Sequence, residues 1–387
     1  MGRRRAPKDN PFAPLLPKLT GLSGSPLSAV ADRLRKDLED LQATFAAGLL
    51  SSDEALAAAR LYDLIVKSLP HSFGERFLFD SAMVQALVDQ WSRPSCRLPT
   101  LIVPIYHTEW AHASLFPLGR DRENMDVIHL LYIEGTDDIG DVDLLSYSWM
   151  CHELAHNLLF RYDAGLIAQF HPVLNRRANA LHLSALSDQG SVKTQARQLV
   201  EEMVQVWSLS GDQRNWAHEL AADLIALWTC GPAYLAAFQE AAEDSAVDPH
   251  RIDRSHPTYY ARACALIEGA RNLRWTAEAD EVSSIRGSWL RPQWKGQTRN
   301  KSLALADREL VSECVRAAFC LCRALELPQC ARPGMARLRE LLDRGGTPDF
   351  GTELILAAWL VREQRGEELY EEWESATLFE LQRYIML

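Results

Sequence analysis

The chain has 387 residues, enough for two or three domains, and its 47% hydrophobic and 24% charged residues are those of a globular protein. Its net charge of −11 argues against a nucleic-acid-binding surface. No apolar run approaches the ~20 residues that a membrane-spanning helix needs, and no apolar signal-peptide core follows Met1–Arg5. We therefore expect a soluble, cytoplasmic protein without a nucleic-acid partner or a membrane span.

The first part of the chain predicts helices and then strands. Residues 1–24, rich in Pro, Gly and basic side chains, are expected to be a flexible N-terminal arm. Apolar residues recur every three or four positions in 25–95, which predicts a helical N-terminal region, with a helix start at Ser51–Glu54. Leu101–Tyr106 and Asp126–Ile133 have the composition of β-strands.

The segment Ser146–Phe160 contains the motif H-E-x-x-H within an apolar, helical pattern. His152 and His156 are four residues apart, so a helix places both imidazoles on one face, where they can bind one metal ion. Zn²⁺ suits such a pair, and Glu153 beside them can take a proton from water at the metal. Cys151 points about 100° away from His152 and is expected to be a core thiol.

A second ligand segment follows after 175–214, which predicts two more helices with a break near 187–191. Asn215–Gly231 predicts a helix with an N-cap at Asn215 and a stop at Gly231. Within it, Glu219 and Asp223 share one face, and a carboxylate is the expected third ligand of a zinc site with two histidines. His218 is the alternative third ligand.

The remainder of the chain predicts helices separated by one loop. His256-Pro257 resembles the opening of a helix, with Pro257 near its first turn and Arg262 further along. Residues 271–301, rich in Trp and Arg, are expected to be an ordered loop whose tryptophans cover the core. Residues 301–387 predict a helical accessory region. The eight cysteines of the chain have no paired ligand spacing and are expected to be reduced thiols.

Taken in order, H-E-x-x-H, E-x-x-A-D and H-P followed by Arg resemble the gluzincin metallopeptidases, nearest to their Ste24/HtpX-like branch. The resemblance covers about a third of the chain, Asp126–Ala270. It implies the following roles: zinc ligands His152, His156 and Glu219; general base Glu153; a supporting carboxylate, Asp223; and His256 and Arg262 near the substrate oxyanion. That branch is mostly embedded in membranes, unlike this chain, so its substrates do not carry over.

The resemblance also implies a fold. It predicts an α+β, predominantly α protein whose residues 96–300 form a zincin-like core with a small antiparallel sheet, flanked by helical regions. Asp126–Ile133 would be the sheet edge that pairs with an extended substrate. Metzincin chemistry is not favoured, because Leu159 and Tyr162 replace the Gly and the third His that follow that motif.

The function expected from these motifs is that of a zinc-dependent metallopeptidase with one Zn²⁺ per chain and a protein or peptide substrate. One alternative is a zinc-binding regulatory protein whose site no longer turns over and whose helical N- and C-terminal regions bind a protein partner. The other is a helical scaffold without a metal, in which the three motifs are coincidental. Zinc content and dependence on Glu153 distinguish the three hypotheses.

Overall fold

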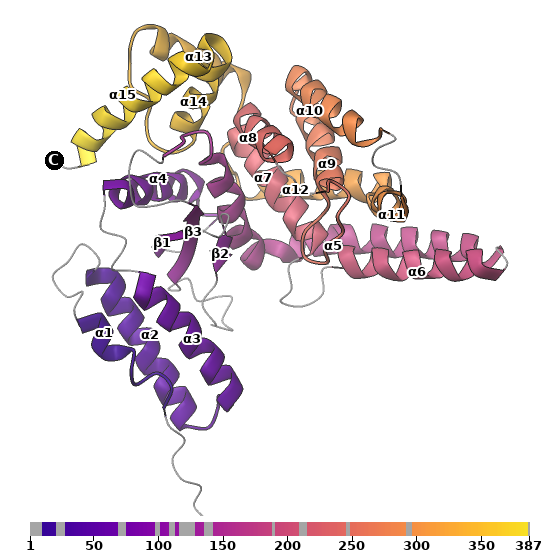
Figure 1. Cartoon of the computed structure of the whole chain (residues 1–387), viewed down its shortest axis with the longest axis horizontal. Helices are drawn as coiled ribbons and strands as arrows, with labels where there is room; N and C mark the ends of the chain where they lie inside the picture. The colour runs from indigo at the N-terminus through magenta and orange to yellow at the C-terminus, as the bar shows by residue number, and fades with distance from the viewer. Residues whose placement is uncertain are drawn as a thin grey trace, which may run out of the picture. The chain divides into compact units, whose positions relative to one another are not determined.

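The computed structural model describes residues 10–20, 28–68, 75–96, 101–107, 113–115, 128–134, 142–187, 190–208, 215–244, 248–291 and 296–385. The chain divides into two compact units, whose helices and strands are labelled in Figure 1. Unit 1 comprises Met1–Ser81 and Pro99–Val142, and unit 2 comprises Ala82–Leu98 and Asp143–Ile385. The C-terminal helices and the H-E-x-x-H segment belong to the same unit.

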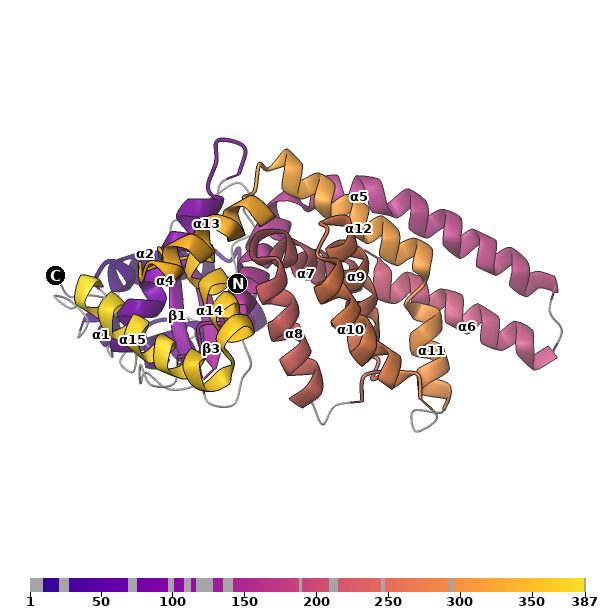
Figure 2. The ribbon, with the colours of Figure 1, turned by 90° about the horizontal axis from the view of Figure 1, so that it is seen from above.

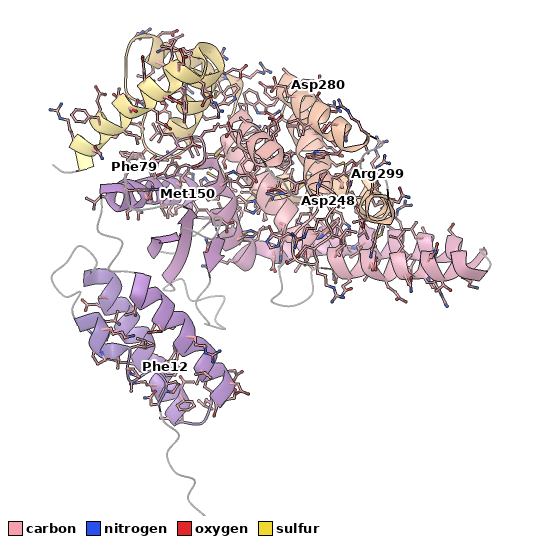
Figure 3. The ribbon with its side chains drawn as sticks, in the orientation of Figure 1. Phe12, Phe79, Met150, Asp248, Asp280 and Arg299 are labelled. Carbon is pink, nitrogen blue, oxygen red and sulfur yellow. The ribbon has the colours of Figure 1, made fainter. Side chains whose placement is uncertain are left out.

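The helices of unit 1 begin within the segment expected to be an arm. They are α1 (Leu16–Thr20), α2 (Ser28–Ala46), α3 (Ser52–Ser68) and the start of α4 (Glu75–Trp91), whose last ten residues belong to unit 2. The predicted start of α3 is confirmed, since Ser51 and Glu54 exchange side-chain and backbone hydrogen bonds as a capping box. Phe12, in the turn before α1, is fully buried (Figure 3).

Unit 1 also contains a three-stranded sheet in the order β1-β3-β2, made of β1 (Leu101–His107), β2 (Ala113–Leu115) and β3 (Ile128–Glu134). β1 runs parallel to β3, with Leu101 opposite Ile128. β2 runs antiparallel on the other side, with Ser114 opposite Leu131. The strand expected to be a free antiparallel edge is therefore the centre of a mixed sheet, with hydrogen-bonded neighbours on both sides. Asp126 and Val127, included in that prediction, lie outside the described residues.

Every helix or strand that the structure describes in unit 2 is a helix. After the end of α4 come α5 (Ser148–Ser187), α6 (Gly190–Trp207), α7 (Trp216–Cys230), α8 (Pro232–Asp244), α9 (Tyr259–Asn272), α10 (Thr276–Trp289), α11 (Gln297–Leu305), α12 (Arg308–Ala324), α13 (Arg332–Asp343), α14 (Thr352–Arg365) and α15 (Glu367–Ile385). The long helices α5 and α6 lie side by side and antiparallel (Figures 1 and 2). Side chains fill the spaces between the helices, and Met150 on α5 is almost fully buried (Figure 3).

The prediction of an α+β fold is wrong. Most of the residues that the structure describes are helical, and unit 2, which carries the H-E-x-x-H segment, has no strand among its described residues. The strand-forming runs around residues 101–134 pair with one another in unit 1, whereas α5 packs against α7 and α12. The segment that carries the motifs therefore lies in an all-helical unit. It is not a zincin-like core built on a small antiparallel sheet.

α7 is the central helix of unit 2 and contacts α5, α8, α9 and α12. Every residue of α7 except His218 is buried, which is typical of a helix surrounded by others. Its predicted ends are confirmed: the Asn215 side chain accepts hydrogen bonds from two backbone N–H groups at the start, and Gly231 ends the helix at a φ of 52°. Two acidic side chains, Glu219 and Asp223, are thereby held inside the unit.

Three element boundaries differ from their predictions. The H-E-x-x-H helix does not stop before 175 but continues unbroken to Ser187, because Pro172 is accommodated within it. α9 begins at Tyr259, since the Thr258 hydroxyl caps it and Pro257 precedes that cap. Much of 271–301 is helical, as α10 and α11 show. In the part of the chain that the structure describes, no helix has the length and apolarity that crossing a membrane requires.

Candidate metal centre

The two histidines of α5 converge as their spacing predicts. The Nε2 atoms of His152 and His156 lie 3.2 Å apart, and the two rings are perpendicular. Both residues are only 4% exposed, so these nitrogens are shielded from bulk water. Ring nitrogens directed at one point from one helix face are suited to share a metal ion.

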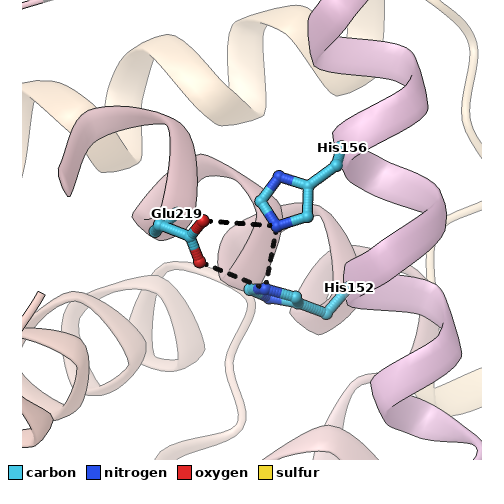
Figure 4. Close-up of side chains that lie close together, drawn as sticks. All are labelled: His152, His156 and Glu219. Carbon is cyan, nitrogen blue, oxygen red and sulfur yellow. Dashed lines mark hydrogen bonds and ion pairs between the residues drawn. The ribbon is translucent and has the colours of Figure 1, made fainter. Parts of the chain in front are cut away.

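Glu219 completes the cluster from the neighbouring helix α7 (Figure 4). One carboxylate oxygen lies 3.5 Å from His152 Nε2, and the other lies 3.5 Å from His156 Nε2. Two ligand atoms at ~2.1 Å from a tetrahedral zinc ion would be about 3.4 Å apart, which agrees with these separations. The buried group of His152, His156 and Glu219 could therefore bind a metal ion.

The polar atoms of the cluster fit a cation. Glu219 Oε1 is buried and accepts no hydrogen bond, which is costly for a carboxylate oxygen unless another cationic partner binds it. Glu153, Glu219 and Asp223 are all buried, and Arg262 forms an ion pair with Asp223. Positive charge from a divalent ion would stabilise these buried carboxylates.

The pKa values of the cluster follow from these contacts. Burial raises the pKa of Glu219, but the neighbouring His156 and His152 outweigh burial and hold the pKa well below its usual value. Burial lowers the pKa of His152, but hydrogen bonds and charges, chiefly those of Asp223, raise it to about 9. Glu219 is therefore ionised at neutral pH, and a metal ion would displace a proton from His152 when it binds.

Asp223 contacts His152 on the side away from the cluster. Its Oδ1 atom lies 2.8 Å from His152 Nδ1 and accepts a hydrogen bond from the Tyr234 hydroxyl at 2.5 Å. Arg262 on α9 donates from Nε to Oδ2 at 2.8 Å and from Nη2 to Oδ1 at 2.6 Å. The pKa of Asp223 is raised by burial, but Arg262 and His152 lower it to about 2. Asp223 is thus a fully ionised carboxylate with donors on both oxygens.

The other residues expected at the site lie at different depths. Glu153 is 6% exposed on the same helix turn as His152. The His256 side chain is 57% exposed, and its Nε2 atom lies 4.0 Å from Glu219 Oε1. Backbone and side-chain hydrogen bonds to Asp253, and the Ser255 hydroxyl beside His256 Nδ1, hold the segment before α9. His256 is therefore an accessible polar group next to the cluster.

The two competing ligands are not part of the cluster. His218 Nε2 lies 3.7 Å from Asp163 of α5, and the metal-capable group includes Glu219 instead. The thiol of Cys151 is fully buried against Cys230, with 3.2 Å between the sulfur atoms, as expected of a core thiol. Burial raises the pKa of this thiol well above its usual value.

Tyr234 is a contact of the site that sequence reasoning missed. It lies in the first turn of α8, immediately after the Gly231-Pro232 break, and is fully buried. A signal was present, because a buried tyrosine needs a partner for its hydroxyl and the nearest acidic helix is α7. Its ring also lies edge-on to Trp149, one turn before His152.

No protein-family model, curated protein or solved structure matches this chain.

Proposed function

We propose that this chain is a zinc-dependent metallopeptidase of the gluzincin type, which hydrolyses peptide bonds in a protein or peptide substrate. The observation that carries the proposal is the convergence of His152, His156 and Glu219 from two helices on one buried point. The adjoining Glu153 supplies the acid–base group that hydrolysis needs. A bound Zn²⁺ would act there as a Lewis acid that lowers the pKa of water and polarises a carbonyl oxygen.

Side chains of the protein would transfer the proton and stabilise the oxyanion. Glu153 accepts a proton from the attacking water while the water oxygen bonds to the carbonyl carbon. As the carbon–nitrogen bond breaks, Glu153 delivers that proton to the leaving amine. His256, exposed next to Glu219, donates a hydrogen bond to the oxyanion that forms between these steps. Water enters the products, and each residue returns to its starting state.

Zinc content tests the metal site. Purified protein should contain about one zinc ion per chain by elemental analysis, because two imidazoles and a carboxylate make a complete ligand set for a catalytic site. Glu219→Ala should lose most of it, whereas Asp163→Ala, next to the competing His218, should retain it. Zinc that is absent, or equal in wild type and Glu219→Ala, would contradict the ligand assignment and favour the metal-free scaffold.

Turnover tests the peptidase. Glu153→Gln preserves the size of the side chain and should retain zinc, yet lower cleavage of a denatured-protein or peptide-library substrate by at least about 100-fold, because the base is lost. Mass spectrometry of the products gives the rate, with Glu201→Gln on the exposed face of α6 as the control. Cleavage by Glu153→Gln at the wild-type rate would exclude Glu153 as the base. Zinc binding without any cleavage by wild type would favour the regulatory alternative.

A further inference from the structure

We infer that Tyr234 and Arg262 are positioning residues, which act through Asp223 to hold the His152 ring with Nδ1 protonated and Nε2 directed at the metal site. This inference rests on the proposed function and deepens it, because it assigns Arg262 to support of a ligand instead of the oxyanion. Neither side chain needs to touch substrate for this role.

The first argument is the saturation of Asp223. Its two oxygens receive the Tyr234 hydroxyl and both donors of the Arg262 fork, at 2.5 to 2.8 Å. The arrangement is bidentate, so it fixes the plane of the carboxylate as well as its position. Because Asp223 is fully buried, no bulk water competes for these oxygens. The carboxylate therefore presents Oδ1 to His152 in one orientation.

The second argument is the tautomer that this orientation selects. An ionised carboxylate only accepts hydrogen bonds, so the 2.8 Å contact with Asp223 requires a hydrogen on His152 Nδ1. The Tyr234 oxygen lies 3.3 Å from the same nitrogen and, having given its own hydrogen to Asp223, can only accept there. Both neighbours thus favour the Nδ1-protonated ring, which leaves the Nε2 lone pair for a cation.

The third argument is the packing that fixes the supporting side chains. The Tyr234 ring lies nearly parallel to the His152 ring, with an angle of 11° between the planes. The Arg262 guanidinium lies 5.2 Å from the centre of the Trp149 ring and 5.8 Å from that of Phe238. The Arg262 side chain is only 13% exposed. Aromatic faces on α5 and α8 therefore hold the guanidinium in the plane that its contact with Asp223 requires.

Zinc affinity of the full chain tests the inference without any need for turnover. Competition with a chelating dye should show zinc binding weakened about tenfold in Tyr234→Phe and by about 10- to 100-fold in Arg262→Lys, which keeps the charge and loses the fork. Tyr370→Phe is the matched control: it also removes a buried hydroxyl that donates to a carboxylate, but on α15, and should leave zinc affinity unchanged.

A second measurement separates positioning from general loss of packing. With ¹⁵N-labelled histidine, the NMR spectrum of the wild type should show a slowly exchanging proton on His152 Nδ1, assigned by its loss in His152→Gln. This signal should exchange faster in Tyr234→Phe and in Arg262→Lys, and stay as in wild type in Tyr370→Phe.

The outcomes distinguish this inference from the proposed function. Wild-type zinc affinity in both Tyr234→Phe and Arg262→Lys would overturn the inference while leaving the zinc site intact. Equal losses in Tyr234→Phe and Tyr370→Phe would also overturn it, since a merely structural effect would then suffice. Zinc bound by wild type without peptide cleavage would overturn the peptidase and leave the positioning role supported. A wild-type chain that binds no zinc would overturn both.

Discussion

Glu219 and Asp223 lie on the same face of α7, one turn apart, and their partners give them different chemistry. Glu219 faces two imidazole nitrogens and keeps one oxygen without a hydrogen bond. Asp223 has hydrogen-bond donors on both oxygens and touches only the far nitrogen of His152. A carboxylate with free coordination capacity suits a metal ligand, and a saturated one suits a support.

Glu374 on α15 offers a test of stability against pH. It accepts hydrogen bonds from the Leu144 backbone and from Tyr370, whose hydroxyl also lies 3.0 Å from Asp143. Burial raises its pKa from 4.5 to about 7; the two hydrogen bonds oppose this shift, and the charge of Asp143 adds to it. Because the pKa is higher in the folded chain than in the unfolded one, protonation of Glu374 stabilises the fold below about pH 4.5, and this stability is lost as the pH rises through 7.

Replacing Glu374 should remove this pH dependence of the unfolding free energy. Relative to Glu374→Gln, the unfolding free energy of wild type should fall by roughly 1 to 2 kcal/mol between pH 5 and pH 8, in urea titrations monitored by circular dichroism. Glu372→Gln, on the exposed side of the same helix, should keep the wild-type profile. Parallel profiles for wild type and Glu374→Gln would show that Glu374 does not titrate in this range.

Gly231 illustrates how the end of one helix sets the position of the next. Its φ of 52° terminates α7, and Pro232 then opens α8, whose first turn carries Tyr234. A larger residue at position 231 would also lack space, because its Cβ atom would lie 2.6 Å from the sulfur of Cys330. Glycine is therefore required at this position both by backbone conformation and by space.

Substitution at this turn should be costly. Gly231→Ala is expected to lower the unfolding free energy by about 1 to 3 kcal/mol, because it combines an unfavourable φ with a steric overlap. Gly165→Ala is the control: this glycine lies within α5 with no atom near its would-be Cβ, so alanine should raise stability by up to about 1 kcal/mol. Equal effects of the two changes in urea denaturation would contradict this account of the turn.

All three residues of the candidate metal centre, His152, His156 and Glu219, lie in unit 2. α5, α7, α8 and α9 each contribute to the cluster or its support, and α12 packs against α5, α7 and α9. The cluster and its support therefore join residues that are more than 100 positions apart in the sequence, from His152 to Arg262. The C-terminal helices belong to the same compact unit as the site.

Much of the candidate site follows from local sequence. The spacing of His152 and His156, the pair formed by Glu219 and Asp223, and the two ends of α7 are properties of a single helix. They were predictable because helical geometry fixes which residues share a face, and because Asn caps and Gly terminators act on neighbouring backbone. The unbroken length of α5 was not, since its packing against α6, α7 and α12 depends on the tertiary structure, whereas Pro172 locally favours a break.

Contacts between distant segments were decided by tertiary structure alone. Sequence by itself determined that two histidines share one face of one helix and that two carboxylates share one face of another. Only packing of α5 against α7 placed Glu219, and not His218, beside the two histidines, and only the approach of α8 and α9 gave Asp223 its partners Tyr234 and Arg262. Strand order in the sheet was likewise undetermined by sequence. The physical reason is that side-chain patterns encode which face of an element is buried, whereas its neighbour depends on how all buried faces of the chain fit together.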